Sequence, residues 1–438
     1  MEQPEVTFTA HNGWADPPVE TAPALDGQVE CDVAVVGGGL AGTAAALRLA
    51  ERGVDVAVLE ADHCGAGASS RNAGQLSSTP GGSPELSSTL HSGRFPGLVR
   101  FSQEAVRFTE ELIDRVDTDC EYEPTGNIVA AVSRGQMRKA RRNGRILRKA
   151  GLELEVGRAR DLGMPDSFEG GLRVNAGGVL NPAKFVLGLR EELLRSDVRV
   201  FERTPVRAVE PQGAGVLVRT PMGRVRADKV LMATNAYSKA LSIAPRGLAA
   251  PIWVGMVETE PVDPGRLEET GWTSRAGLAT EHNIMQSYRL TRRYTVVFGV
   301  RRLHLGRGTV RDREPDAATV SGLVRGFHGQ FPSLQDVAPQ QAWGGWVAMT
   351  PSMLPVAGEA AENVFYAVGC NGHGLAQAPY LGTLLADRML GDEPHRDLVP
   401  VWRDQARFGP SPILNRPALR AAWVADRLSD RLGTPSKR

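Results

Sequence analysis

The sequence predicts a mixed α/β (α+β) protein in which an open parallel sheet is interleaved with a second unit built on an antiparallel sheet. Residues 31–60 follow the order strand, glycine turn, helix, strand. Residues 198–236 alternate apolar and polar side chains with period two, as in half-buried strands, and a Pro-Met-Gly triplet at 221–223 indicates a hairpin turn. Residues 346–390 return to strand, glycine loop and helix, so we expect the chain to leave the first unit and re-enter it at least twice.

The most specific signal is CDVAVVGGGLAGTAAALRLAERGVDVAVLE at 31–60. Gly37, Gly39 and Gly42 have the GxGxxG spacing, which allows a tight turn, a close approach of backbone to a pyrophosphate, and close packing of helix on strand. The helix N-terminus would offer N–H groups and a positive dipole end to that pyrophosphate. Glu60 follows at roughly the ~20-residue separation expected for a carboxylate that binds ribose hydroxyls. An acid there disfavours a 2′-phosphate, so the pattern predicts NAD or FAD rather than NADP.

The remaining elements follow from periodicity. Residues 1–30 are expected to form an irregular arm. Helical apolar spacing or a proline start predicts helices at 95–117 and 133–150, a proline-started helix after a turn within 178–195, and a short helix near 317–330. β-Branched and aromatic runs predict strands at 122–132, 253–260, 284–290 and 295–300. The predicted division is a nucleotide-binding domain (1–90, 150–245 and 346–395), a substrate domain (91–149 and 246–345) and a C-terminal helical tail (396–438).

Composition argues against several classes of protein. The 438 residues carry a net charge of +1, which gives no electrostatic footprint for nucleic acid. No apolar run approaches the ~18 residues of a membrane span. The polar N-terminal stretch has no signal-peptide core, so we expect a cytoplasmic protein that binds neither nucleic acid nor membrane. The cysteines lack metal-site spacing, so we expect reduced thiols and no metal; they are Cys31, Cys64, Cys120 and Cys370.

Further motifs in a fixed order make one resemblance specific. They are GAGASSRNAGQL (65–76), TGN (125–127), LNPAKF (180–185), ATNAYS (233–238), TEP (259–261), YRLTRRYTVVFG (288–299), GGWVAMTPSMLPVAG (344–358) and GCNGHGLAQAPYLG (369–382). With the fingerprint and an arm containing Trp14, the chain resembles FAD-dependent amine and amino-acid oxidases of the D-amino-acid oxidase (glycine/sarcosine oxidase) superfamily. Within it, the chain is most similar to gamma-glutamylputrescine oxidase-like proteins, and the resemblance covers almost the whole chain.

The resemblance implies a Rossmann-like FAD-binding domain of the p-hydroxybenzoate hydroxylase type, with an antiparallel-sheet substrate domain over the flavin. It implies hydride transfer from the carbon beside a neutral amine to flavin N5, hydrolysis of the imine, and reoxidation by O2 to give hydrogen peroxide. The substrate would be a small-molecule amine. Noncovalent FAD is expected, because the linking cysteine of sarcosine oxidases falls near Val347 here and Cys370 is better explained as a packed thiol.

Cofactor contacts are expected from the glycine turn, from Glu60, from the GAGASSRNAGQL loop and from small turns after later strands. Arg71 is expected as the cation of that loop, with a surface arginine as the alternative. The residues expected at FAD are Gly37, Gly39, Leu40, Ala41, Gly42, Glu60, Ala61, Ala68, Ser69, Ser70, Arg71, Asn72, Ala73, Gly74, Gln75, Val206, Ala233, Thr234, Asn235, Gly358, Gly372, His373, Gly374 and Leu375.

Amine oxidation needs little acid–base machinery, because burial alone lowers the pKa of the substrate amine. The protein has to hold the C–H bond over the flavin. The candidate catalytic residues are His373, Tyr288 and Trp346. For His373, at a helix N-terminus after the GCNGHG loop, a structural hydrogen bond is the alternative. For each expected pocket wall, core packing is the alternative. The expected walls are Met256, Tyr288, Trp343, Trp346 and Met349.

The chain departs from sarcosine-type relatives at two points. Leu375 and Ala376 stand where those relatives place a lysine that binds a substrate carboxylate, which disfavours an α-amino acid unless an arginine such as Arg289 substitutes. No lysine lies between Lys239 and Lys437, although relatives use one to activate oxygen. An amino-acid or N-methyl-amino-acid oxidase and an amine dehydrogenase with another electron acceptor therefore stay open. A flavin monooxygenase and a flavin-binding protein without turnover are more distant alternatives.

Overall fold

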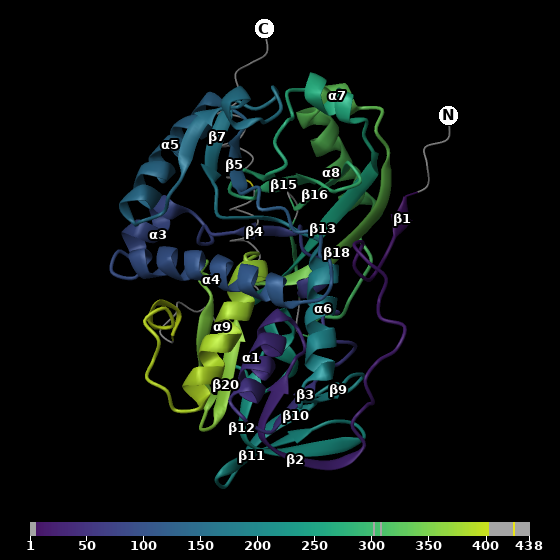
Figure 1. Cartoon of the computed structure of the whole chain (residues 1–438), viewed down its shortest axis with the longest axis vertical. Helices are drawn as coiled ribbons and strands as arrows, with labels where there is room; N and C mark the ends of the chain where they lie inside the picture. Colours follow the sequence, from purple (N-terminus) through teal and green to yellow (C-terminus); the bar gives the residue numbers. More distant parts are fainter. Residues whose placement is uncertain (1–5, 301–302, 307–308, 403–423, 425–438) are drawn as a thin grey trace.

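The computed structural model describes residues 6–300, 303–306, 309–402 and 424. Two large sheets organise this part of the chain, one of eight strands in the lower half of Figure 1 and one of ten strands in the upper half. A two-stranded ladder of β4 (Gln75–Ser77) and β8 (Gly177–Val179) lies at their junction. The predicted mixed α/β class is confirmed.

The eight-stranded sheet has a parallel core in the order β20, β12, β2, β3, β9. β12 pairs with antiparallel β11 near its start and with parallel β20 over its last three residues, so one long strand holds two partners on the same side. The strands of this sheet are β2 (Gly27–Val36), β3 (Val56–Leu59), β9 (Arg199–Phe201), β10 (Ala208–Gln212), β11 (Gly215–Arg219), β12 (Gly223–Met232), β19 (Val356–Ala361) and β20 (Val364–Val368).

Helices cover one face of this parallel core. Alternate residues of β2 and β3 point into two separate apolar clusters, because successive side chains in a strand face opposite sides. On one side, α1 (Leu40–Glu51) and α9 (Gly374–Met389) pack so closely that a Cβ on Gly382 would lie 2.1 Å from the Ala41 carbonyl oxygen. α4 (Phe95–Arg115) and α6 (Pro182–Arg195) complete the cluster. Figure 1 shows α9 and α1 side by side in front of the sheet.

The ten-stranded sheet runs in the order β1, β18, β13, β16, β15, β14, β5, β7, β6, with β17 also paired to β13. Helix α8 (Ala317–Gln330) covers one face of it through Leu323 and Phe327. The strands are β1 (Thr7–Phe8), β5 (Asn127–Ala131), β6 (Glu155–Arg158), β7 (Gly170–Val174), β13 (Ala250–Pro261), β14 (Gly277–Thr280), β15 (Gln286–Leu290), β16 (Thr295–Val300), β17 (His304–Leu305) and β18 (Pro339–Met349).

Four further α-helices complete the described part of the chain, and most predicted helices appear close to the expected bounds. α5 (Arg134–Lys149) is the predicted basic helix. The others are α2 (Ala68–Arg71), α3 (Pro84–Leu90) and α7 (Pro264–Glu269). The arm is less irregular than predicted, because β1 pairs in parallel with β18.

One part of the predicted division differs from the sheet membership. β6 pairs with β7, and β7 pairs with β5, so both strands belong to the ten-stranded sheet, whereas the predicted division places residues 150–245 in the nucleotide-binding domain. The register pairs Ala131 with Gly170 and Asn127 with Val174, so the β5 partner of β7 is distant in the sequence, and short glycine-containing strands carry no local sign of such a partner. The domain boundaries stay a prediction. Most of the predicted tail at 396–438 lies outside the described residues.

Candidate functional site

The predicted cofactor residues gather at one edge of the eight-stranded sheet. β2, β3, β12 and β20 run parallel, so their carboxyl ends meet at that edge. Gly37 follows β2, Glu60 follows β3, Ala233 follows β12 and Gly369 follows β20. Ligands of open α/β sheets bind at such carboxyl ends. Four segments that are far apart in the sequence therefore contribute to a single site.

The glycine turn has the geometry that the fingerprint predicts. Gly37 has φ of 105°, a conformation that favours glycine. A Cβ on Gly42 would lie 1.9 Å from the Gly37 carbonyl oxygen, so turn and helix are in direct contact. Helix α1 begins after Gly39 without a side-chain cap on that residue, and Ser69 Oγ accepts the Leu40 N–H at 3.0 Å. The positive end of the α1 dipole therefore faces the turn and the loop that carries Ser69.

Glu60, directly after β3, accepts a hydrogen bond from the glycine turn. Its Oε2 accepts the Gly38 N–H at 2.7 Å and its Oε1 accepts the Asp62 N–H at 3.0 Å. Burial raises the pKa of the Glu60 carboxyl, although these N–H bonds oppose the rise. The Thr204 N–H donates to the Glu60 carbonyl at 2.7 Å, which brings the loop of Val206 to the same place. Glu60 and Val206, predicted from separate motifs, thus border one region, while Ala61 is exposed.

Arg71 has three protein partners. Its guanidinium donates to the Ala66 carbonyl at 2.8 Å and the Ala10 carbonyl at 2.6 Å, and it pairs with Asp312 at 2.8 Å. The side chain is 2% exposed, so it is not the surface arginine that was the alternative. Arg71 joins its loop to the N-terminal arm and to the segment before α8. Its role at a cofactor stays a prediction.

The rest of the 68–75 loop is held to both sheets. The Asn72 amide donates to the Ser69 carbonyl at 2.8 Å, and its Oδ1 accepts the Gly74 N–H at 2.9 Å. Gln75 donates to the carbonyls of Leu278 and Tyr288 in the ten-stranded sheet, both at 3.3 Å. Residues 68–75 therefore connect the glycine turn of the eight-stranded sheet to strands β14 and β15 of the ten-stranded sheet. Ala68, Ser70 and Ala73 lie in this same connecting segment.

The GCNGHG loop contacts the turn after β12 and the turn after β18. Asn235 Oδ1 accepts the Gly369 N–H at 3.0 Å, and Asn371 Oδ1 accepts the Thr350 N–H at 2.8 Å. The loop ends at His373, the N-cap of α9, whose Nδ1 lies 3.2 Å from the Asn371 carbonyl oxygen. Burial lowers the pKa of the His373 imidazole, which is therefore neutral at pH 7. Thr234, Gly372, Gly374 and Leu375 belong to these same turns.

Gly358 lies in β19, and the atoms nearest to a Cβ at this position would belong to Tyr366 rather than to the GCNGHG loop. It pairs with Tyr366 across the β19–β20 ladder, and a Cβ there would lie 2.8 Å from the Tyr366 hydroxyl oxygen. The small residue is thus required by the neighbouring strand. A contact of Gly358 with the cofactor stays a prediction.

The candidate catalytic side chains are not brought together. Tyr288 packs against Phe298, Phe327 and Phe331 on the α8 side of the ten-stranded sheet, as the core-packing alternative predicts. Trp346 donates its Nε1–H to the Arg311 carbonyl at 2.8 Å and packs in the cluster on the far side of the eight-stranded sheet. Of the three, His373 alone belongs to the gathered strand ends.

Two of the predicted pocket walls do share a face. Met256 and Trp343 are paired across β13 and β18, and they pack with Trp14 and Ala73. Trp14 donates its Nε1–H to the Asn72 carbonyl at 2.8 Å, which ties the arm to the 68–75 loop. The sequence does not predict these contacts of Trp14, because an aromatic residue in a polar arm has no periodic pattern around it. Met349, at the end of β18, lies further along the strand.

Three further features of the described residues bear on the chemistry: metal ligands, membrane-spanning helices and the Cys370 thiol. No group of three or more His, Cys, Asp or Glu in that part of the chain could hold a metal ion. No described helix is long and apolar enough to cross a membrane. Burial raises the pKa of the Cys370 thiol to about 12, so it is protonated at neutral pH.

Known proteins resemble this chain in both sequence and fold. The family described as "FAD dependent oxidoreductase" matches residues 32–388. The chain is 30% identical over 380 residues to a gamma-glutamylputrescine oxidoreductase of Escherichia coli K12, covering 84% of this chain and 85% of that protein. It is 26% identical over 389 residues to a glycine oxidase of Bacillus licheniformis, covering 86% and 97% respectively. The crystal structure of glycine oxidase from Geobacillus kaustophilus superposes with a TM-score of 0.73 at 22% identity, over 87% of this chain and 100% of that one.

Proposed function

Since this chain belongs to the family of FAD-dependent oxidoreductases, we propose that it oxidises the CH–NH bond of a small-molecule amine to an imine. FAD would be the hydride acceptor and O2 the final electron acceptor, with hydrolysis of the imine and release of hydrogen peroxide. The relatives support the bond type: one is named for gamma-glutamylputrescine and another for glycine, and both molecules carry an amine.

The observation that carries the proposal is the gathering of Gly37, Glu60, Ala233 and the α9 N-terminus at one sheet edge. These residues fit FAD. A Cβ on Gly42 would lie 1.9 Å from the Gly37 carbonyl oxygen, so the missing side chain lets the N-terminus of α1 pack directly on the turn, as the dinucleotide-binding fingerprint requires. When bound, FAD supplies an N5 atom that accepts a hydride from the substrate carbon. The cofactor would be held noncovalently, because the Cys370 thiol has a raised pKa.

The chain's own residues would bind, orient and exclude water. The first turn of α9 directs backbone N–H groups toward the sheet edge, where they favour negative charge. His373 is neutral and hydrogen-bonded to the Asn371 carbonyl, which holds a proton at Nδ1 and adds no charge of its own. Met256 and Trp343, which pack together in one apolar cluster, would form the apolar wall of the substrate pocket. An amine against that wall would lose its proton readily, because burial disfavours the ammonium form.

A dehydrogenase is the second candidate, with an electron acceptor other than O2. No lysine lies between Lys239 and Lys437, so the oxygen-activating lysine of sarcosine-type relatives has no counterpart there. This absence is compatible both with a dehydrogenase and with an oxidase in which the flavin surroundings or another cation activate O2. An amino-acid or N-methyl-amino-acid oxidase is a variant of the first candidate, and it differs in whether the substrate needs a carboxylate.

Anaerobic titration of the purified yellow protein tests the proposal. Putrescine, gamma-glutamylputrescine, N-methyl amines and amino acids are added in turn, and the oxidised-flavin absorbance is followed. Bleaching by an amine, with recovery and stoichiometric hydrogen peroxide on admission of air, is the expected result. Bleaching with slow recovery in air and fast recovery with an artificial acceptor would favour the dehydrogenase. A protein without flavin, or a flavin that none of these compounds reduces, would contradict the proposal.

A further inference from the structure

A cavity lies on the face of the eight-stranded sheet that is turned away from α1 and α9. Its volume is about 480 Å³. Small-molecule sites commonly have volumes of roughly 300–1,000 Å³. Its walls are the short 3-10 helix η2 (Asn235–Ala240), the loop that follows it, the start of β13 and the ends of β12, β18 and β20. The cavity is therefore large enough for a ligand of one or two rings.

The floor of this cavity is apolar. Met232, Tyr366 and Val368 come from the neighbouring strands β12 and β20, and Leu241 and Leu248 come from the loop after η2. All five belong to the apolar cluster on this face of the sheet, and each is at most 8% exposed. A ligand that has an apolar body would be stabilised by lying on this floor, because its surface would leave water.

The charged residues of the lining are two exposed cations, and no acid is among them. Lys239 lies in η2, and Arg246 lies in the turn at 245–248, where Gly247 has φ of 77°. Among the residues that the structure describes, no carboxylate forms an ion pair with Lys239 or Arg246. Partial burial lowers the pKa of the Lys239 ammonium, and no neighbouring charge opposes that effect. The rim of the cavity thus has a single sign of charge.

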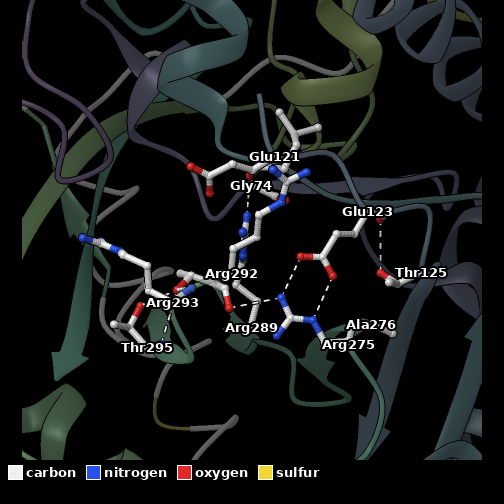
Figure 2. A network of polar contacts seen from close by, with 12 residues as sticks. Gly74, Glu121, Glu123, Thr125, Arg275, Ala276, Arg289, Arg292, Arg293 and Thr295 are labelled. Atoms are coloured by element: carbon white, nitrogen blue, oxygen red, sulfur yellow. Dashed lines mark hydrogen bonds and ion pairs between the residues drawn. The ribbon is translucent and has the colours of Figure 1, made fainter. Parts of the chain in front are cut away.

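Cations near the ten-stranded sheet have partners within the protein. Figure 2 shows Arg275 paired with Glu123 at 2.6 Å, and Arg289, which is 1% exposed, donating to the Gly74 carbonyl at 3.1 Å. A single exposed lysine or arginine without such a partner is common on a protein surface. Two of them at the rim of one apolar cavity that has no acid attract an anion together, because their fields add.

We propose that this cavity binds a small organic acid with an apolar body, which lies on the floor while its carboxylate contacts Lys239 and Arg246. The two parts of the lining determine this chemical class, since the rim favours an anion and the floor favours an apolar group. The ammonium form of a substrate amine would be repelled by the same rim. The occupant is therefore a compound other than the amine that is oxidised.

The cavity differs from the place of the proposed oxidation. Met256 and Trp343, the expected wall of the substrate pocket, do not line it. Asn235 does line it, and its Oδ1 accepts the Gly369 N–H of the GCNGHG loop at 3.0 Å. A bound acid would thus lie beside the residue that holds this loop, without contacting the α9 N-terminus itself.

Calorimetric titration of the FAD-loaded protein with 1-naphthaleneacetate and 1-naphthaleneacetamide tests the proposal. The two compounds have the same ring system and differ in charge. Wild type should bind the acid at least about ten-fold more tightly than the amide, because each exposed cation should contribute about three-fold. Lys239→Met and Arg246→Met should each weaken binding of the acid by about three-fold, and the double variant should bind acid and amide equally.

Two further variants separate this cavity from the rest of the surface. Arg145→Met/Lys149→Met removes the same two residue types from α5, where both are exposed and neither lines the cavity, so the preference for the acid should be unchanged. Ala244→Phe adds a ring at a partly buried lining position. It should weaken binding of both acid and amide at least about ten-fold, because the cavity is then filled.

Equal binding of acid and amide by wild type, or binding of neither, would overturn the proposal without any variant. A preference that survives in Lys239→Met/Arg246→Met, or that Arg145→Met/Lys149→Met also removes, would do the same, as would unchanged binding in Ala244→Phe. If a variant does not fold, the wild-type comparison and the remaining variants still decide. Calorimetry does not depend on turnover, so a protein that no amine reduces would contradict the proposed function and leave this result readable.

Discussion

The carbonyl oxygen of Gly37 lies 1.9 Å from the position that a Cβ atom on Gly42 would occupy. Turn and helix can come this close only because residue 42 has no side chain. Gly42→Ala should therefore move the first turn of α1, lower stability by about 1–3 kcal/mol and weaken FAD binding at least about ten-fold. The dissociation constant for FAD, measured by flavin fluorescence quenching on reconstitution of apoprotein, checks this.

The matched control is Gly322→Ala in α8, where a Cβ would meet nothing within 4 Å. That substitution should leave FAD affinity unchanged and stability equal or slightly higher, because alanine favours helix. An unaltered FAD dissociation constant in Gly42→Ala would contradict the assignment of the glycine turn.

A buried ion pair holds the loop after β3. Arg190 donates to both carboxylate oxygens of Glu202 at 2.7 Å, and Glu202 also accepts the N–H groups of Ala22 and Cys64 at 2.7 Å. Burial alone would raise the pKa of Glu202, but these bonds hold it below its ordinary value. Arg190→Met leaves the carboxylate unpaired and should lower the free energy of unfolding by about 3–5 kcal/mol.

Urea denaturation at pH 7 measures that loss. Arg195→Met is the control in the same helix, because Arg195 is 53% exposed and its ion pairs are worth at most about 1 kcal/mol. Equal losses of unfolding free energy in Arg190→Met and Arg195→Met would show that the buried Arg190–Glu202 pair stabilises the protein no more than the exposed pairs of Arg195.

The pH dependence of stability should carry a contribution from His373. Burial lowers its pKa from the ordinary 6.5, so the unfolded chain binds a proton more readily than the folded chain. The contribution to stability is therefore fully present above about pH 6.5 and is lost as pH falls through the lower folded pKa. His373→Asn should flatten the fall in unfolding free energy between pH 7 and pH 5, since asparagine does not titrate and is favoured at an N-cap.

Urea denaturation of both proteins at half-unit pH steps provides the comparison. At pH 7.5 the His373 imidazole is neutral, so the difference in unfolding free energy between the two proteins at this pH gives the effect of the substitution on packing. That difference is subtracted from the values at every other pH. Parallel curves for wild type and variant from pH 7.5 to pH 5 would contradict a lowered pKa for His373.

FAD should be released when the protein is denatured. The Cys370 thiol has a pKa of about 12, and a thioether bond would need its thiolate. Acid precipitation should leave all flavin absorbance in the supernatant, and Cys370→Ala should bind the same amount of FAD as wild type. A yellow pellet, or a flavin-bearing peptide in a tryptic digest, would contradict noncovalent binding.

Local patterns in the sequence predicted the elements well. Helix α8 has the predicted bounds, Ala317–Gln330, because its apolar spacing and the aspartate that caps it are both local. Helix α6 begins at Pro182, where proline suits a first helical position. The glycine turn, Glu60 and the α9 loop were found in the sequence because each follows a strand at a fixed spacing.

Relationships between distant segments could not be predicted in the same way. Which strands pair with β6 and β7 depends on contacts that no local period records. The face that Tyr288 takes depends on the register of β15 with β16, and a shift of one residue would exchange it with Arg289. The burial of Arg289 depends on Trp14, which is 275 positions earlier in the chain.

The position of β20 and α9 governs when the protein becomes able to function during its own synthesis. β2 and α1 leave the ribosome first, but the partner that flanks β12 and the helix that covers α1 come from residues 364–389. Most of the chain must be translated before the cofactor edge exists. Until then α9 does not cover α1, and the pairing that completes the sheet is long-range and therefore slow.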